Sequence, residues 1–114
     1  MSEQTIHKSV VRGLLETALQ ESWMYKNSNT LASAGDCLLV DTQIESLIIT
    51  LPPDPQIDDK VLIADYKGTW SQHNVTVSRN SHTIAGVAED FLCDMNNSMV
   101  TFVYIDVNQG WRPM

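Results

Sequence analysis

Apolar and polar positions follow different patterns in the two parts of this chain. From residue 4 to residue 25, apolar side chains recur at steps of three and four, with no proline and a single glycine. This is the period of an amphipathic α-helix. Its stripe consists of Ile6, Val10, Val11, Leu14, Leu15, Ala18 and Leu19, with a possible extension to Ser22 and Trp23. The pattern predicts a helix of about 20 residues and about 30 Å.

The pattern changes after the polar turn sequence KNSNT, residues 26–30. Beyond it, short runs rich in Val, Ile, Thr and aromatic residues alternate with clusters of Gly, Pro, Asn and Asp, which is typical of β-strands and turns. The candidate strands are residues 37–41, 46–51, 60–65, 75–79, 83–84, 91–93 and 99–107.

The spacing of these runs predicts a mainly β protein. No helical period remains after residue 31 to provide crossovers for parallel strands, so we expect a compact antiparallel β-sandwich or barrel-like domain over residues 31–114. Residues 1–30 are expected to be the helix and its linker, serving in anchoring or oligomerisation. The stripe of the helix must be buried either on its own β domain or against a partner, and the sequence leaves both open.

Charge narrows the classes of partner. The chain has 14 acidic residues against 7 Lys and Arg, giving a net charge of -7, and its cations are scattered singly. Nucleic acid and anionic membranes are therefore not expected as partners. No apolar run spans a bilayer, and the opening MSEQTIHK has no signal-peptide pattern. We expect a protein made in a cytoplasm and kept or assembled there.

Acidic residues are concentrated in the stretch LPPDPQIDDKVLIADYKG, residues 51–68. The calcium-loop pattern D-x-[DN]-x-[DN]-G is absent from it. Each aspartate instead stands beside a proline, a strand start or a turn glycine, which favours turn and strand-end roles over cation binding. These aspartates are Asp54, Asp58, Asp59 and Asp65.

Other catalytic patterns are not found. The histidines His7, His73 and His82 have no Cys or His partner at metal-ligand spacing, and no serine lies in a G-x-S-x-G sequence. Glycine-rich phosphate loops are also absent. We therefore expect no enzyme activity, no catalytic or metal-binding residues and no cofactor. Cys37 and Cys93 have apolar neighbours and are predicted to be small buried thiols, with a disulfide left open.

Two tryptophans allow two interpretations. Trp70 and Trp111 either cover a small β core or present rings to a ligand, and the core is favoured for Trp111. A carbohydrate-binding module using Trp70, with Tyr66 and His73 beside it, is the alternative hypothesis for function.

The run MVTFVYIDV, residues 99–107, is apolar on both alternating faces. Val100, Phe102 and Tyr104 form one face, and Thr101, Val103, Ile105 and Val107 form the other. A strand of this kind is covered twice, once by its own core and once by another layer or subunit. Oligomer or virion contacts are therefore expected at the helix stripe and at Phe102, Tyr104 and Trp111.

Residues 35–112 resemble a small β module found in tailed-phage virion proteins. That module opens with LP-x-x-P-x-x-GD-x-V, continues with D-x-x-G-x-[WF]-x-x-N-x-V-x-V-x-RNG-x-x-I-x-G and AEDL-x-L-D, and closes with VYDG-x-x-W. The opening matches Leu51, Pro52, Pro55, Asp59 and Val61. The hairpin matches Asp65, Gly68, Trp70, Asn74, Val75, Val77, Arg79, Asn80, Ile84 and Gly86. The closing segment of the module matches Glu89, Asp90, Leu92, Asp94, Val103, Tyr104 and Trp111.

The chain departs from the module at three turns. Asp58 and Ser81 stand where the module has glycine, and Tyr104, Ile105 and Asp106 stand where it has YDG. The resemblance implies a non-enzymatic virion structural protein, commonly homotrimeric, of the capsid decoration, head-fibre or tail-fibre type. Its implied partners are copies of itself and phage capsid or tail proteins, and its implied location is the virion, assembled in the host cytoplasm.

Overall fold

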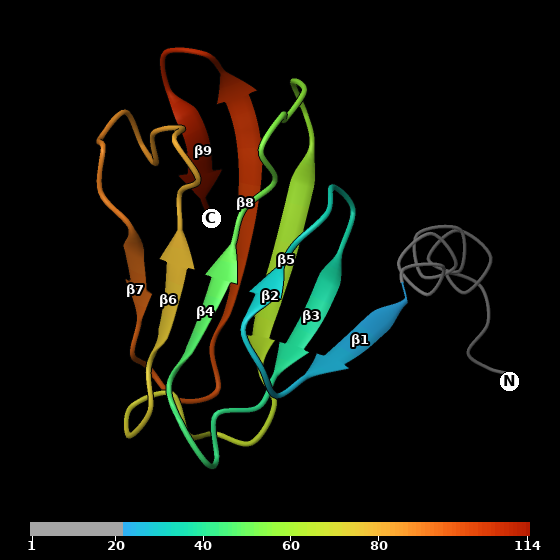
Figure 1. Ribbon diagram of the computed structural model, residues 1–114, viewed down its shortest axis with the longest axis vertical. Coiled ribbons are helices and arrows are strands. Elements are labelled where there is room, and N and C mark those ends of the chain that lie inside the picture. The colour runs from blue at the N-terminus through green and yellow to red at the C-terminus, as the bar shows by residue number, and fades with distance from the viewer. Residues whose placement is uncertain (1–21) are drawn as a thin grey trace, which may run out of the picture.

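The computed structural model describes residues 22–114, and within this range it contains nine β-strands and no helix (Figure 1). The strands are β1 Trp23–Lys26, β2 Thr30–Leu31, β3 Cys37–Val40, β4 Leu47–Thr50, β5 Lys60–Asp65, β6 Val75–Ser78, β7 Phe91–Cys93, β8 Met99–Asp106 and β9 Gly110–Pro113. The predicted mainly β class is confirmed for this part of the chain.

The strands form two facing sheets (Figure 1). Sheet A has five strands in the order β1-β3-β5-β8-β9, and sheet B has four in the order β2-β4-β6-β7. From β1 to β6 the chain changes sheet at every step, because odd-numbered strands lie in sheet A and even-numbered ones in sheet B. Each pair of consecutive strands therefore forms one coil of a flattened two-sheet spiral.

The prediction of purely antiparallel sheets was wrong. β1, β3 and β5 are parallel to one another, as are β2, β4 and β6. Antiparallel pairing is restricted to β5 with β8, β6 with β7, and β8 with β9. The sequence argument assumed that a parallel return needs a helix. Here the return is a strand of the opposite sheet, which buries its own apolar face against the first.

The predicted end of the helix was also wrong. Residues 23–26 form strand β1, in which Trp23 pairs with Cys37 and Tyr25 with Leu39. Thr30, the last residue of the expected linker, is the first residue of β2, which pairs with β4. Backbone hydrogen bonds to the next coil outweigh a local helical period at this point. The rest of the predicted helix, with Ile6, Val10, Val11, Leu14, Leu15, Ala18 and Leu19, lies outside the described residues.

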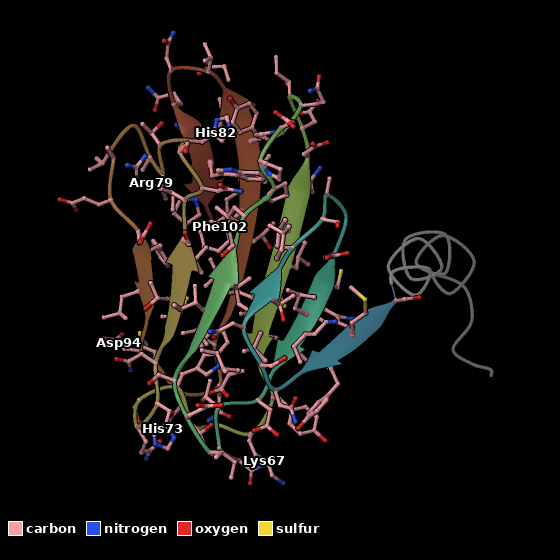
Figure 2. All side chains as sticks on the ribbon, viewed as in Figure 1. Lys67, His73, Arg79, His82, Asp94 and Phe102 are labelled. Atoms are coloured by element: carbon pink, nitrogen blue, oxygen red, sulfur yellow. The ribbon has the colours of Figure 1, made fainter. Side chains whose placement is uncertain are left out.

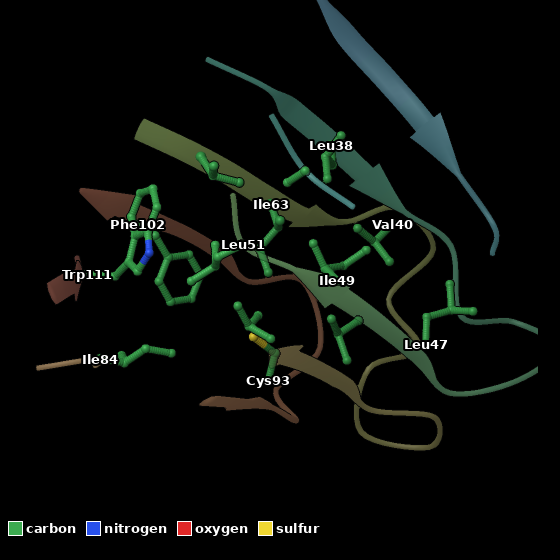
Figure 3. Close-up of a cluster of buried hydrophobic side chains, with 14 of the residues drawn as sticks. Leu38, Val40, Leu47, Ile49, Leu51, Ile63, Ile84, Cys93, Phe102 and Trp111 are labelled. Carbon is green, nitrogen blue, oxygen red and sulfur yellow. The ribbon is translucent and has the colours of Figure 1, made fainter. Parts of the chain in front are cut away.

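The core lies between the two sheets (Figure 3). Sheet A contributes Leu38, Val40, Val61 and Ile63, and sheet B contributes Leu47, Ile49, Val75 and Val77. Burying an aliphatic side chain of this size stabilises a fold by about 1.5–3 kcal/mol. Trp70 and Trp111 complete the cluster with no exposed surface. Both cysteines are buried thiols, as predicted.

Aspartates stabilise the turns between the strands. The Asp59 carboxylate accepts a hydrogen bond from the Gln56 amide at 2.8 Å, and Asp65 accepts bonds from the amides of Gly68 and Thr69 at 3.0 and 3.2 Å. These contacts confirm the turn roles predicted for Asp59 and Asp65. Within residues 22–114, no three His, Cys, Asp or Glu side chains lie together as a set of metal ligands.

Candidate interaction surface

The two central parallel strands of sheet A are apolar on both faces. In β3 and β5, Leu38 and Ile63 point into the core cluster. Because successive side chains of a strand point to opposite faces, Leu39, Leu62 and Ala64 point away from the core. An exposed sheet face usually carries polar residues at such positions. The strands are therefore built to be covered on both sides.

The strand register collects these side chains into one surface. Trp23, Cys37, Leu62 and Thr101 lie in one cross-strand row, and Tyr25, Leu39, Ala64 and Met99 lie in the next. Val103 belongs to the same face, between Lys60 of β5 and Arg112 of β9. We define the outer face of sheet A as Cys37, Leu39, Leu62, Ala64, Thr101 and Val103.

Burial distinguishes this face from an ordinary polar sheet surface. Cys37 and Val103 are 0% and 7% exposed although neither belongs to the core cluster between the sheets. Val103 lies between Lys60 and Arg112, whose long aliphatic stems suit them to cover apolar neighbours. At the edge strand, Trp23 and Tyr25 remain 40% and 48% exposed. The apolar surface that this side of sheet A leaves exposed therefore lies mainly at its edge, at the aromatic side chains Trp23 and Tyr25.

The predicted interface residues of the last strands lie on the opposite side. Phe102 and Tyr104 are 0% and 6% exposed and Trp111 is 0% exposed, and all three belong to the core (Figure 3). Tyr104 and Trp111 pack edge to face with ring centroids 5.4 Å apart. The prediction that they contact another subunit was wrong. Both faces of β8 are apolar, and the outward row is Thr101, Val103 and Ile105.

The predicted glycan residues do not form one site. Trp70 is fully buried, and its indole N–H donates to the Val40 carbonyl at 3.3 Å, so its ring faces no ligand. That part of the prediction was wrong. Tyr66 is 48% exposed and packs on Tyr25. The Nδ1 atom of His73 lies 2.7 Å from the Thr42 carbonyl oxygen, and Figure 2 places His73 at the same end of the molecule as Lys67.

Cys93 lies in the core cluster, next to the carboxylate of Asp94 along the chain. Burial, with a smaller contribution from Asp94, raises the pKa of the Cys93 thiol to about 12. A reactive cysteine needs a lowered pKa and solvent access. Cys93 is therefore a packing residue.

No protein-family model and no curated protein matches the chain. Among the described residues, no helix has the length and apolar character needed to cross a membrane.

Sequence reasoning missed Leu39, Leu62 and Ala64 as surface residues. The signal that would have identified them is the unbroken apolar runs CLLV and VLIA. In a strand with one face in water, apolar and polar residues alternate, whereas a strand covered on both faces is apolar at successive positions.

Proposed function

We propose that this protein is a non-enzymatic structural subunit of a tailed-phage virion, which associates with copies of itself and with capsid or tail proteins. The observation that carries this proposal is the apolar outer face of sheet A, where Leu39, Leu62 and Ala64 are half-buried and Trp23, Tyr25 and Met99 beside them are exposed. Association by such a face depends on buried apolar area rather than on chemistry. A homotrimer in a capsid decoration protein or fibre is the assembly that the resemblance implies.

Backbone geometry supports the resemblance at two of its three glycine departures, whereas Asp106, which stands at the glycine of YDG, does not have positive φ. Asp58 and Ser81 replace glycines of the phage module, and both have positive φ, 76° and 75°. Glycine is the residue that adopts this conformation without steric cost. This chain therefore keeps, at both turns, the backbone shape for which the module uses glycine.

The hydrogen bonds of the aspartate in the hairpin motif also support the resemblance to the phage module. In D-x-x-G-x-W, Asp65 accepts hydrogen bonds from the amides of Gly68 and Trp70. The spacing of the motif thus corresponds to a single turn stabilised by one carboxylate. A motif with this physical basis is a stronger indication than scattered identities.

The energetics suit an assembly protein. An interface of ordinary size buries about 1,600 Å² in total. At about 25 cal/mol per Å² of apolar area, the gross driving force is large before the costs of association are subtracted. The part of the predicted helix that lies outside the described residues, residues 4–21, would provide a second contact, to the virion or between subunits.

The test is the molar mass of the full chain, measured by light scattering after gel filtration. Leu62→Asp places a charge on the outer face of sheet A, and we expect it to convert the oligomer to monomers with an unchanged β circular dichroism spectrum. Ile48→Asp is the matched control, because Ile48 is an exposed apolar residue on the outer side of sheet B. A monomeric wild-type protein, or dissociation by Ile48→Asp alone, would refute the proposed use of sheet A.

A further inference from the structure

A surface pocket lies where β1 and β3 end. Figure 1 shows these strand ends toward the lower end of the molecule. It has a cavity volume of about 390 Å³ and is lined by Tyr25, Asn27, Asp41, Gln43, Ile44 and Glu45. Small-molecule sites fall in a volume range of about 300–1,000 Å³. The parallel pairing of β1 with β3 brings the two lining segments together, which the sequence pattern does not predict.

Asp41 organises the pocket. Its carboxylate accepts hydrogen bonds from the Tyr25 hydroxyl, from the Gln43 backbone amide at 3.0 Å and from the Gln43 side-chain amide at 3.2 Å. Asp41 is 8% exposed and Tyr25 is 48% exposed, so these bonds are partly shielded from water. The rotamers of Tyr25 and Gln43 are thereby set before any ligand arrives, which lowers the entropy cost of binding.

The same hydrogen bonds fix the protonation states. The bond from Tyr25 lowers the pKa of Asp41, and in turn the bond to Asp41 raises the pKa of Tyr25. At neutral pH the carboxylate is charged and the phenol keeps its proton. The Tyr25 hydroxyl donates its proton in the hydrogen bond to Asp41. Its oxygen can therefore only accept a hydrogen bond from a ligand. The Gln43 side chain likewise retains its carbonyl oxygen and one N–H for a ligand.

Apolar surface stands beside these polar atoms. Tyr25 is 48% exposed, and its ring is held by Tyr66, edge to face, with centroids 4.9 Å apart at an interplanar angle of 77°. Ile44 is 86% exposed. A fixed aromatic ring beside a carboxylate and an amide suits a ligand with C–H faces and many hydroxyls. Saccharides have this combination.

The acidic residues that line the pocket favour neutral saccharides over anionic ones. Asp41 and Glu45 line the pocket, and no Lys, Arg or His does so among the described residues. A sialic acid or a sugar phosphate would face like charge and is disfavoured. We propose that this pocket binds a neutral saccharide, with the sugar ring against Tyr25 and its hydroxyls hydrogen-bonded to Gln43 and Asp41.

The experiment is a titration of the ¹⁵N-labelled full chain, followed by two-dimensional NMR. The probes are glucose, galactose, mannose, N-acetylglucosamine and their β-linked disaccharides, with N-acetylneuraminic acid and glucose 6-phosphate as anionic comparisons. We expect at least one neutral sugar to shift the amides of residues 41–45 saturably, with a Kd on the order of 1 mM or tighter. The anionic sugars should bind at least about tenfold more weakly.

Variants assign the binding to the pocket. Gln43→Ala should weaken the neutral sugar by about tenfold or more, and Gln56→Ala, a matched change outside the pocket lining, should leave the affinity unchanged. Gln43→Met serves if the alanine variant is unstable, because it keeps the length of the side chain without its polar atoms. The proposal is overturned if no neutral probe binds, if the shifts lie elsewhere, if anionic sugars bind as well, or if Gln43 variants bind normally. Because Tyr25 lies in the same cross-strand row of sheet A as Leu39 and Ala64, the titration is run on both the wild-type chain and the Leu62→Asp variant, and a failure of both to bind overturns the proposal.

Discussion

The carboxylate of Asp65 accepts a hydrogen bond from the backbone amide of Asn97, 3.0 Å away and 32 residues further along the chain. The same side chain also accepts bonds from the amides of Gly68, Thr69 and Trp70. One aspartate at the end of β5 therefore ties its own turn to the loop before β8.

Asp65→Asn should be strongly destabilising. The amide has a single acceptor oxygen and turns an N–H₂ group toward backbone donors, so some of them lose their partner. Hydrogen bonds to charged groups contribute about 1.5–3 kcal/mol each. We expect a loss of about 3 kcal/mol in the free energy of unfolding, measured by urea denaturation. Asp36→Asn is the control, because the Asp36 carboxylate accepts a hydrogen bond from the exposed Ser33 amide, and the variant should lose about 1 kcal/mol or less. Equal losses would refute the linking role of Asp65.

Gly110→Ala should prevent stable folding. Gly110 has φ +68°, and a Cβ atom there would lie 2.0 Å from the Thr83 carbonyl oxygen. Gly35→Ala measures the cost of positive φ without a steric clash, because Gly35 has φ +90° and no atom lies within 4 Å of the added Cβ. We expect a cost of about 1–2 kcal/mol at Gly35 and more than about 4 kcal/mol at Gly110. Similar melting temperatures of the two variants would contradict this.

Ser81→Gly should stabilise the protein. Ser81 has φ 75° at the position where the phage module has glycine. Relief of the left-handed conformation outweighs the entropy of the more flexible unfolded chain, giving a gain of up to about 1 kcal/mol. Ser71→Gly, at a residue without positive φ, should instead lose a few tenths of a kcal/mol. Calorimetric melting of both variants measures the difference, and a lower melting temperature for Ser81→Gly would count against it.

The two buried tryptophans should respond differently to replacement by phenylalanine. The Trp70 indole N–H donates to Val40, whereas the Trp111 indole N–H is buried without a hydrogen-bond partner within the part of the chain described. Both changes lose apolar area, but Trp111→Phe also removes an unsatisfied donor, which costs about 1–3 kcal/mol where it is buried. We expect Trp70→Phe to be more destabilising by about 1 kcal/mol or more. Chemical denaturation of both variants tests the order, and the reverse order would refute it.

Tyr25→Phe should change the acid stability of the protein. The Tyr25 hydrogen bond lowers the pKa of Asp41 in the folded state. A group with a lowered folded-state pKa contributes stability that is present above its unfolded pKa, about 3.9, and is lost as the pH falls through the folded value. The stability gap between wild type and Tyr25→Phe should be constant near neutral pH and shrink below about pH 4. A gap that is independent of pH down to acid unfolding would exclude this coupling.

The sequence by itself located six of the nine strands of residues 22–114 to within one residue at each end, whereas β1, β2 and β9 were not predicted and the predicted strand 83–84 is only an isolated bridge at Ile84. Alternating apolar positions and turn residues are local signals, and β5 and β7 have the predicted bounds. The turn roles of Asp59 and Asp65 follow from equally local chemistry. The predicted helix failed at its end, where Trp23 and Tyr25 join β3 through hydrogen bonds to residues far along the chain.

Only the tertiary structure decided which strands pair, in which direction and with which face inward. Residues 99–107 are apolar on both faces, so the pattern could not tell that Phe102 and Tyr104 point into the core and Val103 away from it. The pocket has the same origin, because Tyr25 and Asp41 are 16 residues apart and meet only through the parallel coil. The local period of apolar residues predicts that a side chain is buried. The partner that buries it depends on contacts between coils, which no short stretch of sequence contains.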